Sequence, residues 1–134
     1  MKVFVDSNVP MYVAGQQHQN KQPAQRFLEK VRRGSIEACT STEVLQEVLY
    51  RYSALRRLDV ARRVYDLFVQ VCPTVLPVTL ADTDRAKELL CSGGRVSARD
   101  AMHVAVMLNN DVEQIATFDQ GFDSIHGVRR IELA

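Results

Sequence analysis

Several features are absent from this 134-residue sequence, and each absence excludes a class of protein. No uninterrupted apolar run approaches the roughly 18 to 20 residues that a membrane-spanning helix needs. The N-terminal segment turns acidic at Asp6, too early for a secretory signal peptide. Repeats, linkers and low-complexity tracts are also missing. We therefore expect a soluble, cytoplasmic protein.

Cysteine is scarce and scattered along the chain. Cys39, Cys72 and Cys91 are an odd number, and they form neither a CxxC motif nor a Cys/His cluster. This spacing supports neither a disulfide framework nor a zinc site. We expect all three to be small buried hydrophobic residues in a reducing compartment.

A strong net charge is missing as well. The formal charge of +1 supplies no long-range attraction to nucleic acid, so any phosphate contact must come from a local cluster. Arginine outnumbers lysine about three to one, which favours planar, bidentate contacts to phosphate or carboxylate.

The length and the 46% hydrophobic content fit one core of ordinary size, so we predict a single domain over residues 1–134. Strands and helices alternate in the apolar patterning. Strands are predicted at residues 2–5, 36–40, 74–78, 114–118 and 129–133. Helices are predicted to begin at Asn8, at Pro23, after a capping-box pattern at residues 40–43, at Leu58, at Thr79 and at residues 97–100. Loops are predicted at 93–94 and 119–127. The alternation predicts an α/β fold, a three-layer α/β/α sandwich with a mainly parallel central sheet.

Acidic residues occupy the positions where such a fold places its ligand crevice. Asp6 and Asp119 each follow a predicted strand, and open α/β sheets bind ligands at the carboxyl ends of their strands. Each also fits a turn or capping residue. Asp100, three residues after Ser97, fits an ordinary helix start, and Glu47 falls on the polar side of its helix, where exposed glutamates are common.

Carboxylates that meet at one sheet edge cannot all stay ionised without compensation. Like charges a few ångströms apart repel, so they must share a proton or a divalent cation. Oxygen-rich sites suit hard cations, so the pattern indicates Mg²⁺ or Mn²⁺.

The acids also lie in four motifs that occur in order along the chain. The motifs resemble those of PIN-domain ribonucleases, and the small size is similar to the VapC-like toxins of toxin-antitoxin pairs. They cover residues 3–8, 43–49, 97–105 and 115–123.

This resemblance implies a divalent-metal-dependent endoribonuclease that leaves a 5′-phosphate and a 3′-hydroxyl. It implies catalytic and metal-binding roles for Asp6, Glu47, Asp100 and Asp119, and supporting roles for Asn8 and Thr117. It further implies a homodimer and an antitoxin segment that occupies the active-site groove. The RNA and the cleavage sequence stay open.

Other polar residues near the motifs have structural interpretations. We interpret His103, one turn after Asp100, as a satisfied helix histidine and Asp123 as a loop cap. Asp82 and Asp84 fit the positive end of a helix dipole.

Arginines offer contacts to RNA. Arg95 and Arg99 lie beside Asp100 and are predicted to bind RNA. A second group can contact RNA or form a solvated helix face: Arg51, Arg56, Arg57, Arg62 and Arg63. Tyr50 can stack on unpaired bases, whereas Tyr52 fits core packing better.

Two other functions compete with the nuclease. Phosphoaspartate proteins also place Asp after the first strand, but a haloacid-dehalogenase-like phosphatase needs a second Asp where this chain has Asn8, and a receiver needs a late Lys, whereas none follows Lys87. A non-catalytic binding module of the same fold is the other alternative.

Overall fold

The computed structural model describes residues 2–93 and 95–134. Within these residues a parallel sheet runs through the centre of the molecule, in the order β3-β2-β1-β4-β5. Its strands are β1 (Lys2–Val5), β2 (Glu37–Ser41), β3 (Thr74–Leu76), β4 (Gln114–Ala116) and β5 (Arg129–Arg130). The predicted α/β class and parallel sheet are confirmed.

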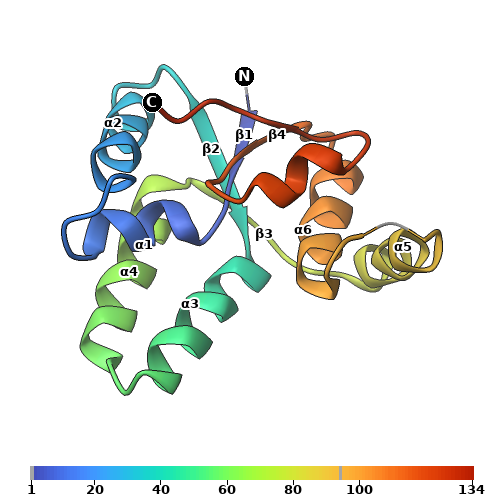
Figure 1. The fold of residues 1–134 in the computed structure, drawn as a ribbon, viewed down its shortest axis with the longest axis horizontal. Helices are drawn as coiled ribbons and strands as arrows, with labels where there is room; N and C mark the ends of the chain where they lie inside the picture. The colour runs from blue at the N-terminus through green and yellow to red at the C-terminus, as the bar shows by residue number, and fades with distance from the viewer. Residues whose placement is uncertain (1, 94) are drawn as a thin grey trace.

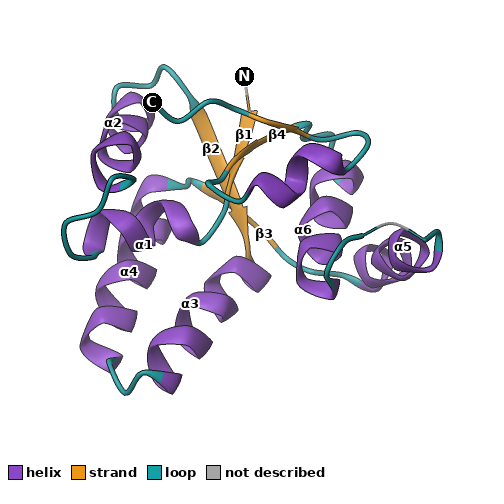
Figure 2. Cartoon of the chain, in the orientation of Figure 1, coloured by secondary structure: helices purple, strands orange, loops and turns teal. Residues whose placement is uncertain are grey.

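Helices cover both faces of the sheet, which gives the predicted three layers (Figures 1 and 2). They are α1 (Asn8–Ala14), α2 (Lys21–Arg32), α3 (Thr42–Ala54), α4 (Leu58–Val71), α5 (Leu80–Cys91), α6 (Ala98–Asn109) and the short 3₁₀ helix η1 (Gln120–Ser124). α1, α2 and α4 lie on one side and α5 and α6 on the other, while α3 extends away from the carboxyl end of β2. No helix in the described part of the chain is long and apolar enough to cross a membrane.

The element boundaries differ from the prediction by a few residues. α2 begins at Lys21 rather than Pro23, and the last three strands are shorter than expected. β3 ends just before Pro77, which has no N–H to continue the ladder. η1 occupies part of the predicted loop at 119–127. Of the predicted loop at 93–94, Gly94 lies outside the described residues.

Polar side chains fix the starts of several helices, α3 and α5 among them. Ser41 caps α3 through Oγ, which accepts a hydrogen bond from the Val44 N–H at 3.2 Å, so the capping box predicted at residues 40–43 is a single cap. The complete capping box lies in α5, between Thr79 and Asp82. Asp82 also accepts from Asn109 Nδ2 at 2.8 Å, in agreement with its structural interpretation, and Asp84 is exposed.

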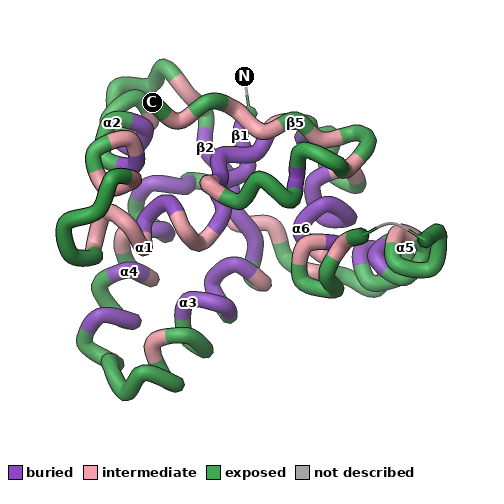
Figure 3. The backbone as a smooth tube through the Cα atoms, in the orientation of Figure 1, coloured by how far each residue is buried: buried purple, intermediate pink, exposed green. Residues whose placement is uncertain are grey.

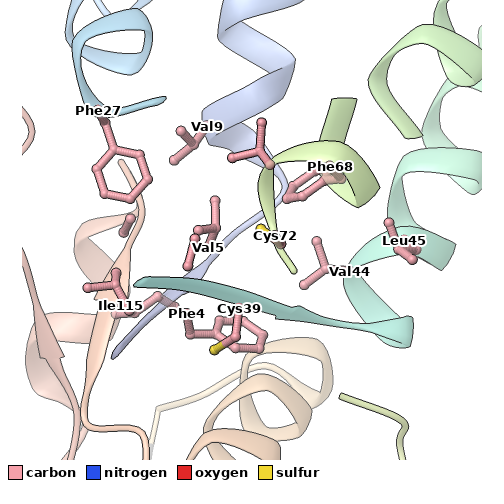
Figure 4. Packing of buried hydrophobic residues seen from close by; sticks show 14 of the residues in the cluster. Phe4, Val5, Val9, Phe27, Cys39, Val44, Leu45, Phe68, Cys72 and Ile115 are labelled. Atoms are coloured by element: carbon pink, nitrogen blue, oxygen red, sulfur yellow. The ribbon is translucent and has the colours of Figure 1, made fainter. Parts of the chain in front are cut away.

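The main core lies between the sheet and its helices (Figure 3). Figure 4 shows Val5 directed towards Val9 on one face of the sheet, while Phe4 and Cys39 point to the opposite face. This is the alternation expected of a strand covered on both sides. Cys72 is also buried, but Cys91 is exposed, so the prediction that all three cysteines are buried is wrong for Cys91.

Truncation of Phe68 in α4 should destabilise the fold strongly. Its ring is 1% exposed in the core, so Phe68→Ala should lower the free energy of unfolding by about 3–5 kcal/mol. The neighbouring Val69 is 46% exposed, so Val69→Ala should change it by less than about 1 kcal/mol. Urea denaturation of both variants measures the difference, and equal losses would contradict the assigned core.

Candidate metal centre

The topology brings the four predicted acids to the carboxyl ends of the sheet strands. β1 and β4 are adjacent and parallel, with Val5 paired to Ala116, so the two strands end at the same level of the sheet. Asp6 follows β1 directly, and Asp119 lies three residues beyond the end of β4. Glu47 reaches this edge from α3, and Asp100 from the first turn of α6.

Asp6 is the buried centre of the site, with 6% of its surface exposed. Oδ1 accepts a hydrogen bond from the Ser7 backbone N–H, and Oδ2 accepts one from Thr117 Oγ1, each at 2.7 Å. Burial raises the pKa of Asp6, and the charge of Glu47 raises it further. His103 and the bond from Thr117 oppose this shift. A cation at Asp6 would therefore relieve a real electrostatic cost.

Glu47 is buried, contrary to its expected place on an exposed helix face, and only 8% of its surface is accessible. Its Oε2 accepts from Ser7 Oγ at 3.0 Å, and its Oε1 lies 2.6 Å from His103 Nε2. Arg99 Nε approaches Oε1 at 3.5 Å from the solvent side. Helical periodicity misplaced Glu47 because Ser7, after β1, and His103, on α6, pack against this side of α3 and replace solvent.

Asp100 and Asp119 form the outer part of the acidic group. Asp100 is half-buried, and its backbone N–H donates to Ser97 Oγ at 3.1 Å. Burial raises the pKa of Asp100, and the charges of Asp119 and Asp6 raise it further. Asp119 is exposed and accepts from the Gly121 N–H at 2.8 Å, so it caps η1 as well as facing the other acids.

Thr117 and Asn8 hold the two strand-end loops together. Thr117 Oγ1 donates to Asp6 and accepts from Asn8 Nδ2 and from the Asp119 N–H, both at 3.0 Å. Asn8 Oδ1 accepts from the Phe118 N–H at 3.3 Å. α1 begins at Asn8 as predicted, and Ser7 holds the N-cap position. The side-chain amide of Asn8 instead links the loop after β1 to the loop after β4.

His103 is on α6, as predicted, but it is also part of the site, a place that its interpretation as a satisfied helix histidine did not give it. Its ring is 1% exposed and lies 3.9 Å from Asp6 Oδ1 as well as against Glu47. Burial alone would lower the pKa of His103, but the bond to Glu47 and the charges of Asp6, Glu47 and Asp100 outweigh burial and raise it. Its position three residues after Asp100 was the available signal, because that spacing shares a helix face.

The donor set fits a divalent cation. Ligand atoms of Asp6, Glu47 and His103 lie within 4.8 Å of one another. Asp100 and Asp119 add two carboxylates, and the charges of Asp119 and Asp6 are close enough to raise the pKa of Asp100 beyond the effect of burial. Carboxylate oxygens in this number suit hard cations such as Mg²⁺ and Mn²⁺.

A groove of about 930 Å³ opens beside the acids between α1 and α3. Glu47, Ser7 and Arg99 line its inner end, and Tyr12, Tyr50 and Arg51 line its walls. Tyr50 is 59% exposed, whereas Tyr52 is half-buried against the core, as predicted.

The remaining arginines and Asp123 do not line this groove. Arg56, Arg57, Arg62, Arg63 and Arg95 are exposed, and Arg57 pairs with Asp59 at 3.3 Å. Asp123 forms an exposed ion pair with Arg130 at 2.9 Å, which lowers the pKa of Asp123. It therefore joins η1 to β5, and the loop-cap interpretation is wrong.

Without a bound cation, the free energy of unfolding should fall as pH rises from about 6 to about 8. The pKa of His103 is raised above 6.5, and those of Asp6 and Asp100 above 3.8, so the folded state binds more protons than the unfolded state. Their stabilisation is complete below the unfolded pKa values and disappears as pH rises through the folded ones. Urea unfolding in EDTA measures the slope, and saturating Mg²⁺ should reduce it. Stability that rises over this range would contradict the raised pKa values.

The sequence matches the PIN domain family over residues 3–128. Ribonuclease VapC13 of Mycobacterium tuberculosis is 40% identical over 96% of this chain and 98% of its own length. Ribonuclease VapC23 of the same species is 34% identical over 87% of this chain and 92% of its own length.

Solved structures share the fold at lower identity. M. tuberculosis VapC20, a Sarcin-Ricin loop cleaving toxin, superposes with a TM-score of 0.76 at 21% identity, covering 94% of this chain and 96% of that one. VapBC2 of Rickettsia felis, bound to a promoter DNA fragment, has a TM-score of 0.75 at 15% identity, covering 98% of both. The family match and the identity to VapC13 lead to one conclusion: the chain belongs to the PIN domain family.

Proposed function

We propose that this chain is a divalent-metal-dependent endoribonuclease, built as one PIN-like domain, and that it is the toxin of a toxin-antitoxin pair. The observation that carries the proposal is the buried Asp6 carboxylate, held beside Glu47 at the sheet edge with its pKa raised. The 40% identity to a protein named as a ribonuclease supports the reaction class.

In this proposal Asp6 and Asp100 hold the principal Mg²⁺ or Mn²⁺, and Glu47 and Asp119 complete its shell or hold a second ion. The bound cation would activate a water and stabilise charge on the leaving oxygen of a phosphodiester. The residues of the chain orient the donors: Thr117 and the Ser7 backbone each fix one oxygen of Asp6. With both oxygens held, the carboxylate needs little reorganisation when the cation binds.

The groove between α1 and α3 is the proposed path of the RNA. It joins the acidic cluster to Arg51 and Tyr50, which suit a phosphate and an unpaired base respectively. Arg99 lies at the junction, within reach of Glu47, and can exchange that carboxylate for a phosphate. Arg95, on the loop before α6, is a proposed further contact.

An antitoxin and a second copy of the chain are the proposed protein partners. Structures with the same fold are VapBC complexes from R. felis and Salmonella typhimurium, both bound to DNA. An antitoxin that filled the groove would block both the acids and the RNA path.

Asp6→Asn should abolish RNA cleavage because it removes a charged cation ligand, and it should preserve the fold because the asparagine amide has nearly the same shape as the carboxylate. Loss of an outer-shell partner already costs about 10–100-fold in metal sites, so a loss above about 100-fold is expected here. Sequencing of RNA ends after incubation with wild type or with Asp6→Asn, each with and without EDTA, measures activity and identifies the substrate.

Asp66→Asn is the matched control, since Asp66 is exposed on α4. It should cut RNA like wild type. Wild-type expression should arrest growth, and Asp6→Asn expression should not. Cleavage by Asp6→Asn at the wild-type rate, or cleavage unaffected by chelator, would disprove the metal assignment. No cleavage by wild type would favour a non-catalytic binding module.

Arg51→Ala should weaken RNA binding by removing a phosphate contact in the groove. In an Asp6→Asn background, which prevents cleavage, the negative slope of log association constant against log salt for single-stranded RNA should become shallower by about 0.7. Arg33→Ala is the control, because Arg33 is an exposed arginine at the end of α2. Fluorescence anisotropy at several salt concentrations measures the slopes, and equal slopes for both variants would place the RNA elsewhere.

A further inference from the structure

His103 is the one imidazole that contacts the acidic cluster among the described residues, and it is rigidly placed. It lies on α6 one turn after Asp100, and its ring packs against Phe4 of β1 with centroids 5.7 Å apart. Its Nε2 is 2.6 Å from Glu47 Oε1 and 3.9 Å from Asp6 Oδ1. Because the side chain is 1% exposed, neither solvent nor RNA can approach the ring freely.

The two ring nitrogens identify the role of this histidine. Nδ1 is buried and makes no hydrogen bond to a protein group in the described part of the chain. A histidine that ligates a metal through Nε2 carries its proton on Nδ1 and donates it to a nearby acceptor. His103 lacks that acceptor. The Glu47 carboxylate only accepts, so the short contact requires the proton on Nε2.

The contact determines where Glu47 points. Both of its oxygens are held, Oε1 by His103 and Oε2 by Ser7 Oγ at 3.0 Å. Glu47 reaches the site on a flexible side chain, and repulsion from Asp6 would turn an unrestrained carboxylate towards solvent. The N–H of His103 supplies a directed attraction that keeps Glu47 beside Asp6.

We propose that His103 is a positioning residue whose Nε2–H holds Glu47 in the geometry that receives a divalent cation, and that it is not itself a ligand. The inference rests on the proposed function for the purpose of the site. It concerns cation binding, however, which is measurable without RNA.

Two substitutions separate this role from packing and from ligation. His103→Gln keeps an N–H donor that can reach Glu47, whereas His103→Leu fills the space without a donor. In calorimetric titration of the full chain with Mn²⁺, His103→Leu should bind about 10–100-fold more weakly than wild type. His103→Gln should stay within about threefold of wild type, as should the control His126→Leu, which alters an exposed histidine.

The outcomes are distinct. Wild-type affinity in His103→Leu would reduce His103 to a packing residue, and equal losses in both variants would indicate a requirement for the imidazole as a ligand; either result overturns the proposal. In a Glu47→Gln background, His103→Leu should cause no further loss, since the effect passes through Glu47. An undiminished loss in that background would also overturn it.

A second measurement uses the wild-type protein and does not depend on whether the variants fold. NMR of the chain labelled with ¹⁵N-histidine should show the His103 proton on Nε2 both before and after addition of Mg²⁺. Loss of that proton on Mg²⁺ binding would assign His103 as a ligand and overturn the proposal. If RNA is not cleaved while the Mn²⁺ affinities follow the expected order, the ribonuclease function fails and the role of His103 stands.

Discussion

The repulsion between carboxylates packed at one edge of the sheet is the constraint on which the rest of this structure depends. Asp6 and Glu47 are both buried, and both pairs of oxygens are held by protein donors. Such an arrangement opposes folding unless protons, donors or a cation compensate the charge. Burial raises the pKa values of Asp6 and Asp100 first, and neighbouring carboxylates raise both further; for His103 the bond to Glu47 and the nearby carboxylates outweigh burial and raise the pKa.

The parallel sheet makes this concentration possible. β1 lies in the middle of the sheet with β4 beside it, so Asp6 and Thr117 leave neighbouring strands at one level. Thr117 Oγ1 then makes three hydrogen bonds across two segments, donating to Asp6 and accepting from Asn8 and from the Asp119 backbone. A single hydroxyl thus fixes the geometry of both strand-end loops, and Asn8 occupies the place where a phosphatase of related topology would need an acid.

α3 connects the acidic cluster with the proposed path of the RNA. It presents Glu47 to the acids and Tyr50 and Arg51 to the groove, one turn further along. α6 does the same from the other face of the sheet, with Asp100 and His103 directed to the acids and Arg99 to the groove. A partner seated in the groove would therefore contact the helices that carry the acidic cluster, which suits control of the nuclease by an inhibitor.

The sequence by itself determined the α/β class and the order of strands and helices, because apolar periodicity is a local property of the chain. Strand-end polarity pointed to Asp6 and Asp119, whereas Glu47 and Asp100 were added by the resemblance to PIN-domain ribonucleases. The sequence misjudged Glu47 as exposed and left His103, interpreted as a satisfied helix histidine, outside the site, since helical periodicity describes one helix and not the surface against which its polar side packs. Only the tertiary structure decided that Ser7 and His103 hold Glu47 beside Asp6. These contacts join residues 40 and 56 positions apart in the sequence, so their geometry depends on how α3 and α6 meet at the carboxyl end of the sheet.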